Sequence, residues 1–283
     1  MELMGRFGLD ALIAATRENV TYFSDFAPWG QAVHKYFQRP NFVVFPRGEP
    51  PSLLLYPGEA TYLAACPSWI KETYIYVRAR SPRYQGTGPA TVKGKNPAEA
   101  LANVLRERGL GRGHIGLDHE GAAQRIKDSF RSALPQAKFS DASDLFRLIR
   151  MVKTEEEIDR LRKAAVLNER AMQAIFKKAR VGCSELDLAQ EFHCEIAKER
   201  GQVGWLHLGS GRRSAGIFPP SPKRLEAGDL LRSDAGCYLN SYHSDTCATA
   251  VLGEPTAQQV RLFAAGLSGI KACLDVCRPH DRH

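Results

Sequence analysis

Residues 230–253 have the sequence LLRSDAGCYLNSYHSDTCATAVLG, and this stretch decides how the second half of the chain folds. Apolar and polar residues alternate on both sides of a polar centre, a pattern that predicts two antiparallel strands joined by a short loop. With Leu239 and Asn240 as a two-residue loop, Asp234 and Asp245 face each other directly across the hairpin. Their Cβ atoms then lie about 5 Å apart.

Two carboxylates this close repel each other. At an effective dielectric constant of about 20, the repulsion is roughly 3 kcal/mol. A divalent cation between them offsets this repulsion, because hard cations prefer oxygen ligands. Asp234 and Asp245 are therefore candidate metal ligands. The alternative is a different register, produced by a bulge or a longer loop, in which both aspartates are solvated.

Two helices are expected before this hairpin and one after it. Thr154 with Glu157, and Ser184 with Asp187, have the spacing of capping boxes that begin helices. Residues 206–229 are rich in Gly and Pro, which predicts a loop. The expected final helix spans residues 255–277, and residues 148–153 are the expected domain junction.

The first 150 residues alternate between strand-like and helix-like segments, which predicts an α/β domain. Asn96 is the expected N-cap of a helix that has Pro97 in its first turn and ends at Gly109. Residues 120–134 predict a second helix, and residues 81–97 predict a basic loop. The expected strands are residues 11–15, 19–23, 41–45, 52–56, 73–77 and 114–118.

Composition restricts the class of protein. The 283 residues are 43% hydrophobic and 25% charged, the balance of a globular protein. The net charge of +8 is scattered among acidic residues, which argues against a nucleic-acid partner. No apolar run approaches the roughly 18–20 residues that span a bilayer, and residues 1–19 lack the features of a signal peptide. We therefore expect a cytoplasmic protein without a membrane partner, whose seven cysteines are reduced.

Three stretches resemble the creatinase and Xaa-Pro dipeptidase family. RFGLDALIAATRENVTYFSDF, at residues 6–26, is similar to the family's opening segment with its N-x-x-Y-x-(S/T)-x-F motif. LIRMVKTEEEIDRLRKAAVLNERAM, at residues 148–172, resembles the helix that begins the catalytic domain. LEAGDLLRSDAGCYLNSYHSDTCATAVLGEPTAQQ, at residues 225–259, resembles the block L-x-x-G-D-x(3)-D-x-G-x(3)-G-Y-x-S-D-x-x-R-T-x(3)-G-x-P.

This resemblance implies a creatinase-like N-terminal α/β domain over residues 1–150 and a partial α+β "pita-bread" metallopeptidase domain over residues 151–283. It implies hydrolysis of the N-terminal peptide bond of short proline-containing peptides by a homodimer. It also implies two divalent ions (Mn, Co or Zn), held by two Asp, one His and two Glu, which activate a water for attack on the scissile carbonyl. The aspartates of the third block map onto Asp234 and Asp245.

Several positions depart from the family pattern. Ile217 stands where the family often has a substrate-site His, Ala248 replaces an Arg, and His280 replaces the Gly of an R-P-G motif. The downstream His and two Glu ligands have no counterpart in this sequence, so we expect impaired activity. His207 and His243 are expected to be surface or structural histidines.

Two other functions are also consistent with the sequence. One is a metal-independent, creatinase-like hydrolase, although Ile217 at the usual His position argues against it. The other is a non-enzymatic binding protein of the same fold.

Overall fold

The chain was analysed as a computed structural model that describes residues 2–29, 40–76, 91–121 and 123–278. It divides into two compact units, Met1–Val152 and Lys153–His283. Residues 81–90 of the expected basic loop, and His280 in the C-terminal tail, lie outside the described residues.

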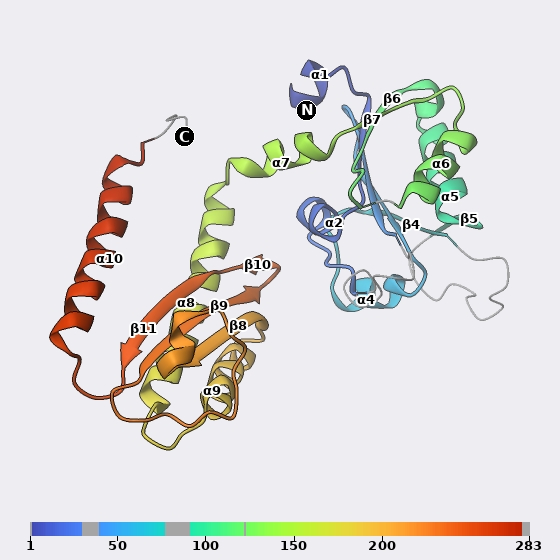
Figure 1. Cartoon of the computed structure of the whole chain (residues 1–283). Helices are drawn as coiled ribbons and strands as arrows, with labels where there is room; N and C mark the ends of the chain where they lie inside the picture. The colour runs from blue at the N-terminus through green and yellow to red at the C-terminus, as the bar shows by residue number, and fades with distance from the viewer. Residues whose placement is uncertain (1, 30–39, 77–90, 122, 279–283) are drawn as a thin grey trace. The chain divides into compact units, whose positions relative to one another are not determined.

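A seven-stranded mixed sheet forms the centre of the first unit (Figure 1), in the order β5-β4-β3-β2-β1-β6-β7. Strand β2 pairs antiparallel with both β1 and β3, and the other neighbours are parallel. Five of the six predicted strands are confirmed, and β5 occupies part of the segment expected to be a loop. The strands are β1 (Ala11–Ala14), β2 (Phe42–Pro46), β3 (Ser52–Leu55), β4 (Glu72–Tyr76), β5 (Thr91–Gly94), β6 (His114–Leu117) and β7 (Lys138–Asp141).

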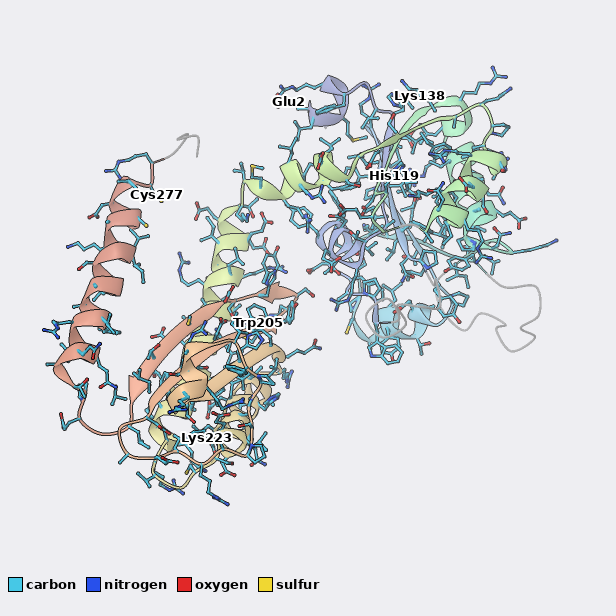
Figure 2. The ribbon with its side chains drawn as sticks, in the orientation of Figure 1. Glu2, His119, Lys138, Trp205, Lys223 and Cys277 are labelled. Carbon is cyan, nitrogen blue, oxygen red and sulfur yellow. The ribbon has the colours of Figure 1, made fainter. Side chains whose placement is uncertain are left out.

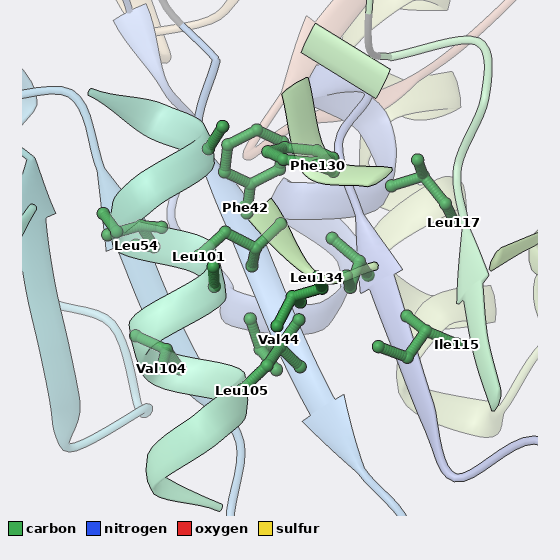
Figure 3. Close-up of a cluster of buried hydrophobic side chains, with 14 of the residues drawn as sticks. Phe42, Val44, Leu54, Leu101, Val104, Leu105, Ile115, Leu117, Phe130 and Leu134 are labelled. Carbon is green, nitrogen blue, oxygen red and sulfur yellow. The ribbon is translucent and has the colours of Figure 1, made fainter. Parts of the chain in front are cut away.

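The core of this unit consists of two apolar clusters. In each cluster, alternate residues of the strands pack against residues of the helices. Helix α5 places Leu101 and Leu105 against Val44 and Leu54 of the sheet, as Figure 3 shows. Burying each of these leucines contributes about 1.5–3 kcal/mol. The second cluster contains residues of α2, α4 and α7. The helices of this unit are α1 (Glu2–Arg6), α2 (Arg17–Ser24), α4 (Glu59–Ala65), α5 (Pro97–Glu107), η1 (Leu110–Arg112), α6 (Gln124–Ala133) and α7 (Ser143–Met151).

The predicted strand at residues 19–23 is wrong, because these residues belong to helix α2. Thr16 caps that helix by accepting a hydrogen bond from Asn19 N at 3.2 Å. The buried carboxylate of Asp118, which follows β6, accepts from Thr16 N at 2.8 Å and from Asn19 Nδ2 at 2.7 Å. The two bonds to Asp118 involve a residue about a hundred positions away. They stabilise a helix here although the β-branched composition of the segment favours a strand.

In the second unit, α8 (Glu155–Lys178) and α9 (Glu185–Lys198) cover one face of a four-stranded sheet (Figure 1). Strand β9 (Leu230–Leu239) is central. It pairs with β8 (Gln202–Ser210), and its other edge pairs with β10 (Tyr242–His243) and β11 (Thr246–Val251). Both predicted capping boxes are present, at Thr154 and Ser184. The expected loop at residues 206–229 is wrong in its first part, because residues 206–210 belong to β8.

Alternate residues of β9 face the two helices. Leu231, Ser233, Ala235 and Cys237 are buried. Asn168 of α8 donates from Nδ2 to Ala235 O at 2.8 Å. The residues between them, including Asp234, therefore lie on the face of the sheet away from α8 and α9.

The last helix, α10 (Ala257–Val276), begins at a third capping box, formed by Thr256 and Gln259. No residue of α10 is buried. In the part of the chain that the structure describes, no helix is both long and apolar enough to cross a bilayer. All seven cysteines are free thiols, as expected.

The buried Glu185 ties the segment before β9 to the start of α9. Its Oε1 accepts from Ser210 N at 2.7 Å, and its Oε2 accepts from Ser221 N at 3.0 Å. Both serine hydroxyls donate to the same carboxylate, and Arg213 forms an ion pair with it at 3.2 Å. The 3₁₀ helix η2 (Gly211–Ala215) and the following turn are thereby held beside the sheet.

Replacing Asp118 by Ala should loosen the junction between β1 and α2. The change leaves buried donors of residues 15, 16 and 19 without an acceptor, which costs about 3 kcal/mol or more. Hydrogen exchange of peptides covering residues 11–24 should then accelerate about 100-fold, while peptides from α8 stay unchanged. The exposed Asp128→Ala variant is the control, and equal exchange in both variants would contradict this role.

Replacing Glu185 by Gln should release the segment from Ser210 to Ser221. In the variant, one carboxylate oxygen becomes an NH₂ group, which is itself a donor. It then faces groups that donate to this oxygen in the wild type, at a cost of about 2 kcal/mol. Limited trypsin digestion should cleave after Arg213 several-fold faster in this variant. Glu191→Gln, also on α9 and partly exposed, is the matched control. Unchanged cleavage after Arg213 would show that the carboxylate does not hold this segment.

Candidate metal centre

The turn between β9 and β10 sets the register of the candidate site. Tyr242 pairs with Leu239, so the two-residue loop is Asn240–Ser241. Asn240 and Ser241 have φ values of 49° and 67°, the left-handed conformations of a type I′ hairpin turn. The hairpin was predicted, but the expected loop, Leu239–Asn240, was wrong by one residue.

This correction shifts the pairing by two residues and keeps both aspartates on one face. Asp234 pairs with Cys247, and Thr246 pairs with Ala235. Asp245 lies between β10 and β11, just outside the paired residues, and continuing this register places it diagonal to Asp234, at about 7–8 Å instead of about 5 Å. At an effective dielectric constant of about 20, their repulsion falls to roughly 2 kcal/mol. The predicted direct opposition is wrong, but the shared face agrees with a site that uses both carboxylates.

Strand β8 adds two side chains that the sequence analysis did not assign to the site. His207 pairs directly with Asp234, and Trp205 pairs with Gly236. The Nδ1 atom of His207 is buried and has no hydrogen-bond partner within the described part of the chain. Trp205, labelled in Figure 2, covers Gly236 so closely that a Cβ there would lie 2.2 Å from its ring carbon Cη2. The alternation of apolar residues in VGWLHL indicates a strand, but Gly204 and Gly209 made the segment resemble a loop.

Both carboxylate oxygens of Asp234 have donors. Trp205 Nε1 donates to Oδ1 at 3.3 Å, and Arg232 Nη2 lies 3.4 Å from Oδ2. The Asp234 side chain is 22% exposed and that of Arg232 is 28% exposed. Asp245 is exposed. Asp234 is thus held in place, whereas Asp245 is open to solvent.

The start of β9 is fixed by a second carboxylate, Asp229. Lys223 Nζ lies 2.6 Å from its Oδ2, and Glu226 N donates to the same oxygen at 3.0 Å. Burial opposes ionisation of Asp229, but these two donors outweigh it and hold the pKa of its carboxyl below the usual value. Asp229 therefore stays ionised at neutral pH and anchors the strand that carries Asp234.

Two positions that depart from the family pattern, and His243, lie within the described residues. Ile217 is exposed, and Ala248 packs on the apolar cluster between helices and sheet. His243 is exposed, and its ring centroid lies 5.4 Å from that of Tyr238.

The oxygen atoms of Asp234 and Asp245 are ligands of the kind that divalent cations prefer, and their shared face makes them compatible with such an ion. Among the described residues, however, no group of three or more His, Cys, Asp and Glu side chains is arranged to hold a metal. The geometry therefore provides two carboxylates of a site.

Two protein-family profiles cover most of the chain. The Creatinase/Prolidase N-terminal domain matches residues 1–152, and metallopeptidase family M24 matches residues 159–283. The Xaa-Pro dipeptidase of Pyrococcus furiosus is 28% identical over 157 residues, which are 54% of this chain and 44% of that protein. The Xaa-Pro dipeptidase of Lactobacillus delbrueckii is 23% identical over 72% of this chain and 57% of that protein. The matches thus span less than two thirds of these relatives.

Solved structures share the fold. The X-Pro aminopeptidase from Thermotoga maritima superimposes with a TM-score of 0.77 at 22% identity, over 98% of this chain and 72% of that one. The prolidase from Pyrococcus horikoshii gives a TM-score of 0.73, also at 22% identity, over 98% of this chain and 71% of that one. With an N-terminal creatinase domain followed by an M24 domain of pita-bread fold, the chain belongs to the creatinase and Xaa-Pro dipeptidase family of M24 metallopeptidases.

Proposed function

We propose that this protein is an Xaa-Pro dipeptidase-like metallohydrolase in which Asp234 and Asp245 are metal ligands. The observation that carries this proposal is the placement of Asp234 on the face of β9 away from the helices, with Asp245 directly before the neighbouring strand β11, in a chain of the M24 family. The proposed substrates are short proline-containing peptides, cut at the N-terminal peptide bond, as the names of its relatives suggest.

The chemistry follows from the carboxylates. When bound, divalent ions (Mn, Co or Zn) polarise the scissile carbonyl and lower the pKa of a water. Asp234 is held in place by Trp205, whose Nε1 donates to its Oδ1, and Asp245 is exposed to solvent.

Two carboxylates hold a cation weakly, because tight divalent sites use six or more oxygen ligands or a rigid set of mixed ligands. We therefore propose that the polypeptide of residues 1–283, by itself, binds metal weakly and hydrolyses peptides slowly. The dissociation constant for Mn²⁺ should be of the order of 10⁻⁴ M or weaker.

Titration calorimetry with Mn²⁺ tests the ligand assignment. Asp234→Ala and Asp245→Ala should each abolish measurable binding, because either change leaves a single carboxylate. Asp159→Ala, which removes an exposed carboxylate on α8, should bind like the wild type. Unchanged Mn²⁺ binding in the two site variants would overturn the proposed metal centre.

Release of the N-terminal residue from an Xaa-Pro dipeptide tests the activity. Turnover should depend on added Mn²⁺ or Co²⁺ and lie well below the typical enzyme value of about 10 s⁻¹. Ordinary turnover would contradict the proposed impairment. Turnover that is unaffected by a chelator would instead favour a metal-independent, creatinase-like hydrolase, and metal binding without turnover would favour a binding protein.

The proposal includes a cytoplasmic homodimer, as the family resemblance suggests. Size-exclusion chromatography with light scattering on the purified chain measures the oligomeric state directly.

A further inference from the structure

The guanidinium of Arg232 lies against the carboxylate of Asp234, the proposed metal ligand. Arg232 and Asp234 are two residues apart on β9, so their side chains share one face of the sheet. Arg232 Nη2 lies 3.4 Å from Asp234 Oδ2, while its Nη1 donates to Gly216 O at 2.9 Å. One side chain thus links the candidate ligand to the segment that follows η2.

This link is well placed to persist in solution. Arg232 is only 28% exposed, and a guanidinium keeps its charge at every physiological pH. The segment that it reaches is anchored independently, because Phe218 O accepts from Leu208 N at 3.0 Å and Glu185 holds Ser221. Gly216 O is therefore held where Arg232 can reach it.

A divalent ion and this guanidinium compete for one carboxylate. An ion bound to Asp234 Oδ2 at about 2–2.6 Å would lie within about 6 Å of Arg232 Nη2. Two cations at that distance repel each other strongly in a partly buried site. Trp205 on the other oxygen is neutral and does not compete in this way.

We propose that Arg232 is a built-in counter-cation of Asp234, and that metal binding at Asp234 displaces its guanidinium and releases Gly216 O. This inference rests on the proposed function, because it takes Asp234 to be a metal ligand. It makes Arg232 a positioning residue that lowers metal affinity and couples metal binding to the segment around Gly216.

Mn²⁺ titration of Arg232 variants tests the competition. Arg232→Met keeps the apolar length of the side chain and removes its charge, so Mn²⁺ should bind about tenfold more tightly, or better, than to the wild type. Arg232→Lys keeps the charge and should stay within about threefold of the wild type. Arg224→Met is the matched control, because Arg224 also donates to a glycine carbonyl, Gly182 O at 2.7 Å, on a segment other than the one that Arg232 contacts.

Hydrogen exchange gives a readout that does not depend on activity. In the wild type, saturating Mn²⁺ should accelerate exchange in peptides covering residues 214–218, because Arg232 leaves Gly216 O. In Arg232→Met, exchange there should be fast without metal and unchanged by it. Peptides from α9 serve as the internal control.

The outcomes separate this inference from the proposed function. If Asp234→Ala abolishes binding but Arg232→Met binds like the wild type, the competition is wrong and the metal centre stands. If Arg232→Lys gains as much affinity as Arg232→Met, charge is not the cause and the inference fails. If Asp234→Ala leaves Mn²⁺ binding intact, or if neither the wild type nor Arg232→Met binds Mn²⁺, both proposals fail. Arg232→Gln replaces Arg232→Met if circular dichroism shows that the latter does not fold.

Discussion

The two-residue turn at Asn240–Ser241 is the constraint on which the candidate site depends. Its left-handed backbone fits the right-handed twist of a hairpin, and it fixes which residues of β9 and β11 pair. A slip of one residue would send Asp234 into the apolar cluster against α8 and turn Ser233 outward. The buried positions of Leu231, Ala235 and Cys237 enforce the same register from the opposite face. Local backbone geometry and core packing therefore select one arrangement of the two aspartates.

The segment before β9 is held by charged groups because it has few apolar side chains to bury. Glu185 accepts bonds from two serines and an arginine, and Asp229 is held by Lys223 and a backbone amide. Removing either carboxylate would leave several donors unpaired. These polar contacts also fix the position of Gly216 relative to β9, and thus the distance that the Arg232 side chain has to span. The site is consequently shaped as much by its supporting loops as by the strands.

Much of the fold could be predicted from local signals. Capping boxes at Thr154 and Ser184, and the N-cap at Asn96, depend on residues three apart, and all three were correct. The misses involve contacts that are distant in sequence. The start of helix α2 is fixed by Asp118, which accepts from Thr16 N and Asn19 Nδ2, and β8 is recognisable mainly through its pairing with β9. The candidate aspartates were identified from spacing and resemblance, but His207 and Trp205 required the sheet register, because they lie on β8 and only the pairing with β9 brings them beside Asp234.

The repulsion between Asp234 and Asp245 first suggested a cation at this face, and the structure offers a second way to offset it. At diagonal positions the two carboxylates repel by roughly 2 kcal/mol, and the guanidinium of Arg232 already neutralises one of them. A sheet that carries its own counter-cation does not require a metal ion for folding. If Asp234 is a metal ligand, as we propose, the metal affinity would be set by the difference in free energy between binding of the metal ion and binding of the guanidinium at Asp234. The charge on Arg232 would then lower the metal affinity in addition to the small number of ligands.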